Sequence, residues 1–343
     1  MLGGTMEQPE PDRILNLGLG FWDSKALLSA VELGVFATLA AGPANLAALS
    51  SKLGLHERSA RDFLDTLVAL KLLERDDGRY RNAAEADLFL DPGKPTYVGG
   101  ILEMANARLF GFWGNLTEAL RTGRPQNEIK TGGEVFATIY AEPERLSGFL
   151  RGMSGISAGA AQALAAKFDW SKYASAMDVG AAQGMVPVTL ARAHPHLAVI
   201  GFDLPPVQPV FEAFVEENGL SARVRFHPGD FFEDPLPAAD VIVLGHILHD
   251  WDLDQKLTIL ANVFHALPRG GAVVVYDAII DDARRENAFG LLMSLNMLIE
   301  TSGGFDYTGA DCQSWMRQVG FSDTRVEPLA GPDSMVIGFK TTG

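Results

Sequence analysis

The sequence predicts an α/β protein in which a doubly wound, mostly parallel sheet follows a mostly helical N-terminal domain. Two observations carry this prediction. In the C-terminal half, short apolar runs typical of buried strands alternate with segments of helical periodicity. In the N-terminal third, short amphipathic helices precede two strands around an Asp-Gly turn. We expect an N-terminal domain over residues 1–100, linking helices over 101–165 and the α/β domain over 166–343.

The composition is that of an ordinary globular protein, with 47% hydrophobic and 21% charged residues in a chain of 343. The single cysteine, Cys312, excludes an internal disulfide and a cysteine-cluster metal site. A net charge of −15 without a run of Lys and Arg argues against nucleic acid and anionic lipid as partners. No signal peptide and no apolar run of the ~18 residues that span a membrane are evident, so we expect a cytoplasmic protein.

The N-terminal third predicts a winged helix. Apolar residues at helical spacing indicate a helix over 21–39, interrupted by Gly34, and two further helices over 46–53 and 57–70. Residues 71–80 form two strands around the turn at Asp77 and Gly78. The apolar helix over 21–39 also suits an interface with a second subunit.

A winged helix raises the hypothesis of DNA binding, which the charges oppose. Residues 41–90 contain seven Lys or Arg against eight Asp or Glu. Asp62 and Asp65 lie on the helix that would enter the groove. Because a DNA-reading face normally carries an excess of basic residues, we do not expect this domain to bind DNA.

The stretch from Met177 to Asp203 predicts a cofactor site. A short strand closes on a turn containing Gly180 and Gly184, a helix follows over 186–194, and a second strand ends at Asp203. Backbone N–H groups at such a turn can approach a ligand at the helix N-terminus. Asp203 follows Gly180 by 23 residues, a distance at which a carboxylate can accept hydrogen bonds from both ribose hydroxyls. We expect a cofactor that contains a nucleoside.

The residues of the turn distinguish between two cofactors of this kind. The pattern Asp178-x-Gly180-x-Ala182-x-Gly184 has the spacing of the methyltransferase glycine motif, with Ala182 at the middle glycine. A dinucleotide motif would require glycine where Met185 stands. If the middle position needs a positive φ, alanine there costs about 1 kcal/mol.

Three later strands continue the sheet, over 224–227, 240–244 and 272–276. Gly229, Asp230 and Phe231 follow the first, where an acid and an aromatic ring suit an adenine base, the alternative being a plain turn. The second leads through Gly245 to His246 and to the segment Leu-His-Asp-Trp, which contains His249. Five more elements are expected. They are helices from 253, with a capping box at Asp252 and Gln255, and over 287–300 and 309–319, and strands over 324–328 and 334–339.

With the glycine motif and the Leu-His-Asp-Trp segment, the chain resembles the O-methyltransferases that include plant caffeate and chalcone, acetylserotonin and bacterial natural-product enzymes. The resemblance extends from about Ile14 to Lys340. It implies a Rossmann-like fold, S-adenosylmethionine as cofactor, an aromatic small-molecule acceptor and a homodimer joined through the N-terminal domain. The cofactor-binding residues implied are Gly180, Ala182, Gly184, Asp203, Leu204, Gly229, Asp230, Phe231 and Gly245.

The resemblance also implies the catalytic residues. His249 takes the place of the general base, whose neutral imidazole would accept the proton of a phenolic hydroxyl. Asp277 and Asp306 match two acids that hold this histidine, each one methylene shorter than the family's Glu, and capping of the next helix is an alternative for Asp306. Tyr307 replaces an arginine of the family. His246 has no match and is expected to be a core or supporting histidine.

The acceptor pocket is the least defined part of the prediction. Residues 96–165 and the methionine-rich helix supply candidates, for which a plain core role is the alternative. The candidates are Phe110, Trp113, Met153, Met293, Asn296 and Met297. We expect no metal, because no cluster of ligands stands near the site. Methyl transfer to carbon or nitrogen, other cofactor-dependent chemistry and a winged-helix regulator remain as alternatives.

Overall fold

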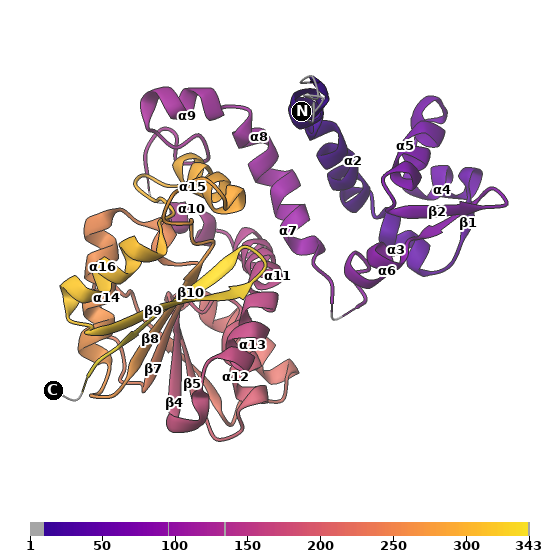
Figure 1. The fold of residues 1–343 in the computed structure, drawn as a ribbon. Coiled ribbons are helices and arrows are strands. Elements are labelled where there is room, and N and C mark those ends of the chain that lie inside the picture. The colour runs from indigo at the N-terminus through magenta and orange to yellow at the C-terminus, as the bar shows by residue number, and fades with distance from the viewer. Residues whose placement is uncertain (1–9, 95, 134, 342–343) are drawn as a thin grey trace, which may run out of the picture. The chain divides into compact units, whose positions relative to one another are not determined.

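The structure is a computed structural model that describes residues 10–94, 96–133 and 135–341. The chain divides into two compact units, Met1–Ala107 and Arg108–Gly343, which are described separately below. Figure 1 shows the course of the chain through the elements of each unit.

The N-terminal unit contains short helices and a small antiparallel sheet. Its helices are α1 (Asp12–Leu19), α2 (Phe21–Glu32), α3 (Val35–Ala40), α4 (Leu46–Leu53), α5 (Glu57–Ala69), α6 (Ala84–Phe89) and α7 (Gly99–Met104). Its strands are β1 (Ala44–Asn45), β2 (Leu73–Asp76) and β3 (Arg79–Asn82), in the order β1-β3-β2. Gly34, in the left-handed region at φ +71°, divides the expected helix over 21–39 into α2 and α3. The sequence prediction missed α1, β1, α6 and the strand pairing that β1 adds.

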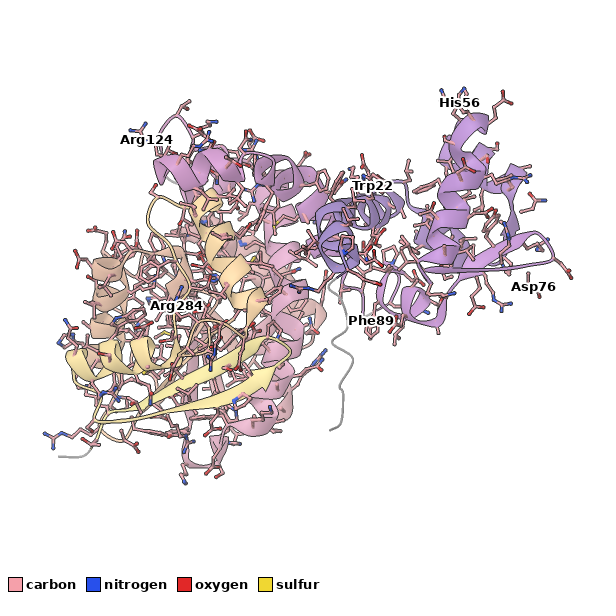
Figure 2. All side chains as sticks on the ribbon, turned by 45° about the horizontal axis from the view of Figure 1, so that its top comes forward. Trp22, His56, Asp76, Phe89, Arg124 and Arg284 are labelled. Carbon is pink, nitrogen blue, oxygen red and sulfur yellow. The ribbon has the colours of Figure 1, made fainter. Side chains whose placement is uncertain are left out.

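Two regions of this unit differ in how far their apolar side chains are exposed. Leu49, Leu64 and Leu67 are fully buried between α4, α5 and the hairpin. Along α1 and the start of α2, by contrast, large apolar side chains are exposed in the single chain. They include Ile14, Leu15, Leu17, Phe21 and Trp22, of which Trp22 is labelled in Figure 2. This apolar surface is of the kind that proteins normally bury against a partner.

The C-terminal unit is built on a seven-stranded sheet. Its strands are β4 (Ser175–Val179), β5 (Ala198–Asp203), β6 (Val224–Pro228), β7 (Val241–Gly245), β8 (Ala272–Asp277), β9 (Asp323–Ala330) and β10 (Asp333–Phe339). They lie in the order β6-β5-β4-β7-β8-β10-β9, with parallel pairing from β6 to β8 and antiparallel pairing of β10 with β8 and β9. The chain order reverses beside β4, which is where ligands bind in sheets of this kind.

Helices cover both faces of the sheet, so the expected doubly wound α/β fold is confirmed (Figure 1). One face packs against α11 (Pro143–Lys167), α12 (Met185–Ala193) and α13 (Gln208–Glu217). The other packs against α14 (Leu253–Ala266) and α16 (Gly309–Val319). Before and beside these lie α8 (Phe110–Trp113), α9 (Leu116–Thr122), α10 (Val135–Tyr140) and α15 (Ala288–Glu300).

Local sequence explains where these elements begin and end. The capping box of Asp252 and Gln255 is present at the start of α14, as expected. Pro205 opens a 3₁₀ turn, Pro205–Val207, and α13 begins only at Gln208. Within the described ranges, none of the helices has both the length and the apolar character needed to cross a membrane.

Candidate active site

A cavity of about 540 Å³ opens at the carboxyl ends of the parallel strands. Its floor is the turn at Gly180 to Ala182, together with Asp203 and Leu204. Aromatic and methionine side chains of α10 and α11 line it from another side, namely Phe136, Tyr140, Phe149 and Met153. A volume of this size, lined by both apolar and polar side chains, suits a ligand as large as a nucleoside derivative.

The glycine-rich turn has the backbone that the motif implies. Gly180 and Gly184 have φ values of +76° and +99°, in the left-handed region that favours glycine. An added Cβ would also lie 2.2 Å from the Ile247 side chain at Gly180, and 2.9 Å from the Phe211 ring at Gly184. We had attributed these glycines to ligand approach alone. The structure adds that close neighbours within the protein require them.

Ala182 adopts the strained conformation that was considered for it. Its φ is +48°, and its N–H donates to Asp203 Oδ2 at 2.8 Å. The position therefore needs a positive φ, and the alanine bears the strain of about 1 kcal/mol that a glycine would avoid.

Asp203 lies at the end of β5, is buried, and points into the turn. Besides the Ala182 contact, its Oδ1 accepts from the N–H of Leu204 at 2.7 Å. Burial raises the pKa of Asp203 to about 6, although these two backbone donors lower it. Its carboxylate is thus prepared for further donors from a ligand, and ribose hydroxyls supply donors of that kind.

Asp230 and Phe231 also line the cavity, next to Gly229 after β6. Asp230 Oδ1 accepts from the N–H of Phe232 at 2.8 Å, so it shapes the turn that was the alternative to an adenine contact. The Phe231 ring lies edge-on to Trp251, with centroids 5.7 Å apart. Both residues line the cavity, and contact with an adenine ring stays a prediction for them.

Gly245 ends β7 and lines the cavity, but its lack of a side chain has another reason. A Cβ there would lie 2.1 Å from the ring of Tyr276 on the neighbouring strand. Close packing of this ring therefore requires the glycine, and a contact of Gly245 with the cofactor stays a prediction.

His249 lies in a 3₁₀ turn, Leu248–Asp250, just beyond β7 and is buried. Its Nδ1 is 3.2 Å from Asp306 Oδ1 and 3.5 Å from Asp277 Oδ1. Its Nε2 faces the other way, toward Asp250 Oδ1 at 3.7 Å. Both predicted acids therefore converge on one ring nitrogen, although each is shorter than the family's Glu.

Asp306 does not cap the helix that follows, which was the alternative for it. Thr308 is the N-cap of α16, in a capping box with Asp311. The segment that carries Asp306 lies close to the turn that carries His249. A Cβ added at Gly304 would be 2.5 Å from the carbonyl oxygen of His249.

Tyr307 explains how the short side chain of Asp277 is held. Its hydroxyl donates to Asp277 Oδ2, while Asp277 Oδ1 faces His249. The residue that replaces the family's arginine thus binds the acid on the side away from the histidine.

The carboxylates change the expected protonation of His249. Burial lowers its pKa, but the charges of Asp277, Asp306 and Asp250 together outweigh this and raise the pKa to about 10. In the protein without ligands, the carboxylates thus favour the protonated imidazole over the neutral form that a general base requires. Burial and Asp306 raise the pKa of Asp277 to about 7, against the lowering effect of His249.

His246 is buried, as expected, yet it is more than a core residue. Its φ is +54°, it lines the cavity, and its Nδ1 is 3.7 Å from Asp277 Oδ1. Burial lowers its pKa to about 3, so the ring is neutral. Candidate ligand atoms of His246, His249 and Asp277 lie within 4.8 Å of one another. The expectation that no cluster of potential metal ligands stands near the site is therefore wrong.

The candidates for the acceptor pocket separate into two groups. Met153 lines the cavity together with the cofactor residues. The other candidates are not among the residues that line it, and they lie on α8 and α15. Asn296 accepts a hydrogen bond from Trp113 Nε1 at 2.9 Å, so its amide oxygen is already engaged. The candidates outside the lining are Phe110, Trp113, Met293, Asn296 and Met297.

Sequence analysis passed over two residues near His249. Trp251 lies two residues after His249 and packs edge-on against the ring of Phe232, with centroids 4.7 Å apart. Lys256 on α14 is fully buried and donates to the carbonyl oxygen of Trp251. A lysine in the apolar stripe of an otherwise amphipathic helix was the available signal for the second.

Comparison with known proteins gives two matches to family models. Residues 113–322 match an O-methyltransferase domain, and residues 15–92 match an O-methyltransferase dimerisation domain.

Individual proteins agree with these matches. The chain is 47% identical to the tetracenomycin polyketide synthesis 8-O-methyl transferase of Streptomyces glaucescens, over 96% of this chain and 97% of that protein. It is 42% identical to an N,N-dimethyltransferase of Streptomyces rimosus, over 79% of each. Among solved structures, human N-acetylserotonin methyltransferase in complex with S-adenosylmethionine has a TM-score of 0.90 at 28% identity, covering 99% of this chain and 100% of that one.

Proposed function

The chain belongs to the O-methyltransferase family, and on this premise we propose that His249 is the general base that deprotonates a phenolic hydroxyl of a polycyclic aromatic acceptor. The protein is an S-adenosylmethionine-dependent O-methyltransferase that acts on an aromatic small molecule. The polyketide named in its 47%-identical relative supports the acceptor class. The observation that carries the base is the convergence of Asp306 and Asp277 on His249 Nδ1, which leaves Nε2, 3.7 Å from Asp250 Oδ1, as the nitrogen that would receive the proton. Asp250 lines the cavity, whereas His249 is not among its lining residues.

The size of the cavity and the residues that line it suit this cofactor. The cavity volume of about 540 Å³ lies in the range of small-molecule sites. Asp203 offers a buried carboxylate at the point where the strand order reverses. We assign ribose binding to Asp203, the methionine end of the cofactor to the turn at Gly180 to Gly184, and the adenine to Asp230 and Phe231. When bound, S-adenosylmethionine supplies a methyl group on a positively charged sulfonium.

The acids and the histidine of this chain have separable tasks. Asp306 orients the imidazole through Nδ1, and Tyr307 fixes Asp277 against the same nitrogen. His249 must lose its own proton before it can accept another. A cation brought into the cavity favours that loss because like charges repel. The imidazole formed in this way is a strong base, since the carboxylates that raise its pKa stabilise the imidazolium after proton transfer.

A second candidate, methyl transfer to an amine, is favoured by one observation, the 42% identity to an N,N-dimethyltransferase. Both reactions need an acceptor atom with a free lone pair held against the methyl carbon, so the arrangement around His249 serves either. An amine with an unprotonated nitrogen needs no base before it attacks, whereas a phenol does.

The two candidates are tested with matched acceptors. The protein is incubated with isotope-labelled S-adenosylmethionine and polycyclic phenols, the corresponding aryl amines and the phenol methyl ethers, and products are detected by mass. Labelled methyl ethers formed from the phenols are the expected result. Product from the amines alone would overturn the acceptor assignment, and product from the methyl ethers would indicate transfer to carbon.

For the N-terminal unit we propose a homodimer interface. Residues 15–92 match the dimerisation domain, and the exposed apolar side chains of α1 and α2 supply the surface. We propose no contact with nucleic acid, since Asp65 of α5 accepts from Tyr80 and pairs with Arg75, and the net charge is −15. Light scattering at micromolar concentration tests the dimer, and a monomer mass would overturn it.

A further inference from the structure

A buried lysine lies between the two segments that form the base. Lys256, in the first turns of α14, is 0% exposed, and its Nζ donates to the carbonyl oxygen of Trp251, two residues after His249. A lysine is almost never buried without partners, because an ammonium ion is costly to remove from water. Its partners therefore indicate its role.

The second set of partners belongs to the segment that carries Asp306. Lys256 Nζ lies 3.6 Å from the centre of the Phe305 ring, and 5.7 Å and 6.0 Å from the rings of Tyr307 and Trp315. Phe305 and Tyr307 flank Asp306 in the sequence. A cation at such a distance over an aromatic face is attracted by the negative face of the ring, and most strongly where water is excluded.

One ammonium group therefore joins the turn of His249 to the segment of Asp306. The two segments are also packed without space between them. A Cβ at Gly303 would lie 2.9 Å from Asp252 Cβ, and one at Gly304 would lie 2.7 Å from the carbonyl oxygen of Asp250. A shift of either segment would alter the contact of 3.2 Å between His249 and Asp306.

The charge of Lys256 acts on the same cluster. The groups that face it are Asp250 in the 3₁₀ turn, Asp252 at the start of α14, Asp277 on β8, Asp306, and Cys312 on α16. Burial lowers the pKa of Lys256 to about 8 while the carboxylates raise it, so the ammonium is charged at neutral pH. Its positive charge favours the ionised form of each acid.

We propose that Lys256 is a positioning residue for His249. Through an aromatic cage, the rings of Phe305, Tyr307 and Trp315, Lys256 holds the Asp306 segment against the base, and its charge offsets that of the acids. This inference rests on the proposed role of His249 as base. On this inference, one buried side chain sets both the geometry and the electrostatic balance of the pair His249 and Asp306.

The test removes the positive charge of Lys256 and keeps an unbranched, apolar side chain at this position. In Lys256→Met, we expect kcat to fall roughly 10- to 100-fold, the effect of small displacements of reacting groups. Loss of a nearby cation raises every pKa of the cluster, so the acid limb of the kcat profile should move to higher pH by about 1 unit. Cofactor affinity by calorimetry should stay within about twofold of the wild type, because no cofactor-binding group changes.

The chain offers a matched control in Lys340. Its Nζ donates to the carbonyl oxygens of Phe264 and Leu267 at 2.7 Å each and lies 4.7 Å from the Phe264 ring centre. It follows Phe339, which pairs with Ala272 at the opposite end of β8 from Asp277. Lys340→Met should therefore lose stability without moving the pH profile. Lys256→Arg, which keeps the charge, should retain the wild-type acid limb even where its turnover is reduced.

Two further measurements keep the test decisive. If Lys256→Met does not fold, Phe305→Leu removes the cage wall and should give a smaller shift in the same direction. Titration of the His249 ring by NMR in the cofactor-free protein should move to higher pH in Lys256→Met, whether or not His249 is the base.

The outcomes separate this inference from the proposed function. An unmoved ring titration, with a kcat profile like that of Lys340→Met, would overturn the role of Lys256. A ring titration that moves while turnover and its pH profile stay at wild-type values would overturn the proposed base instead, because the imidazole would then be tuned without taking part.

Discussion

The cofactor side of the cavity, at the ends of β4 and β5, and the base side around His249, at the ends of β7 and β8, are built from different parts. On the β4 and β5 side, the polar groups are backbone N–H donors around one carboxylate, Asp203, and they come from a single stretch of sequence. On the β7 and β8 side, they are side chains from four separate segments, with His249 at their centre. The comparison teaches that the cofactor side depends on backbone conformation, whereas the base side depends on how distant segments pack.

The largest effect is expected on the base side. His249→Gln should reduce turnover of a phenol by roughly 10²- to 10⁴-fold near pH 7, since glutamine keeps a hydrogen bond but accepts no proton. The affinity for S-adenosylmethionine should stay unchanged if the two sides are independent. Steady-state rates and calorimetry on the same preparation measure both.

The acidity of the acceptor sharpens this prediction. The loss should shrink at high pH or with a more acidic phenol, because an acceptor with a pKa near 10 then ionises without help. A wild-type rate for His249→Gln near neutral pH would remove His249 from the role of base.

The next largest effect is expected on the cofactor side. Asp203→Ala should weaken cofactor binding by roughly 1.5 to 3 kcal/mol, the range for hydrogen bonds to a charged group, with little effect on an acceptor-only complex. Asp240→Ala is a matched control, because the Asp240 carboxylate also accepts two backbone N–H groups, from Ala174 and Ser175, and is not among the residues that line the cavity. Equal calorimetric affinities for the two variants would contradict the ribose assignment.

The two acids of the base side should differ from each other. Asp306→Asn should lower kcat by roughly tenfold, because an amide can favour the wrong tautomer of His249. Asp277→Asn should cost less, since Asp277 lies farther from Nδ1, at 3.5 Å against 3.2 Å, and is shared with Tyr307. Rates of the two variants against the same phenol rank them, and the opposite order would show that Tyr307 places Asp277 as the main partner.

A change of pH should affect the cofactor side through Asp203. Burial raises the pKa of its carboxyl to about 6, so this group is mostly protonated at pH 5 and ionised at pH 7.5. The ionised form accepts from hydroxyl donors more strongly, so binding should strengthen as the pH rises through 6, by up to about tenfold. Calorimetry at the two pH values measures this, and Asp203→Asn should abolish the difference.

The smallest effect is expected at Ala182. Ala182→Gly should remove the strain of φ +48° and raise the free energy of unfolding by at most about 1 kcal/mol. Urea unfolding of the two proteins measures it. A destabilisation would mean that the methyl group contributes packing that outweighs the strain.

The same comparison explains how much the sequence predicted. The strand, turn and helix around Gly180, and Asp203 at its distance of 23 residues from Gly180, were predicted because the spacing of the glycines indicates the backbone conformation of the turn. The family resemblance that His249 and the glycine motif carried is confirmed by the comparisons. The residue at Asp306 was found only through that resemblance, because nothing local links it to His249 across 57 positions.

What the sequence missed has physical causes. The protonated state of His249 depends on three carboxylates that meet only in the folded chain, so no local pattern encodes it. The role of Tyr307 is a long-range contact of the same kind. The acceptor candidates on α8 and α15 were chosen by residue type, and apolar residue type alone does not separate a pocket wall from packing between helices.

The exposed apolar side chains of α1 and α2 have a thermodynamic consequence beyond the interface itself. If a second copy covers them, association and folding are linked by mass action, and each subunit gains stability from the concentration of its partner. The unfolding midpoint of the protein should then rise with protein concentration and fall on dilution. A value quoted at one concentration would describe a subunit pair and not the isolated chain.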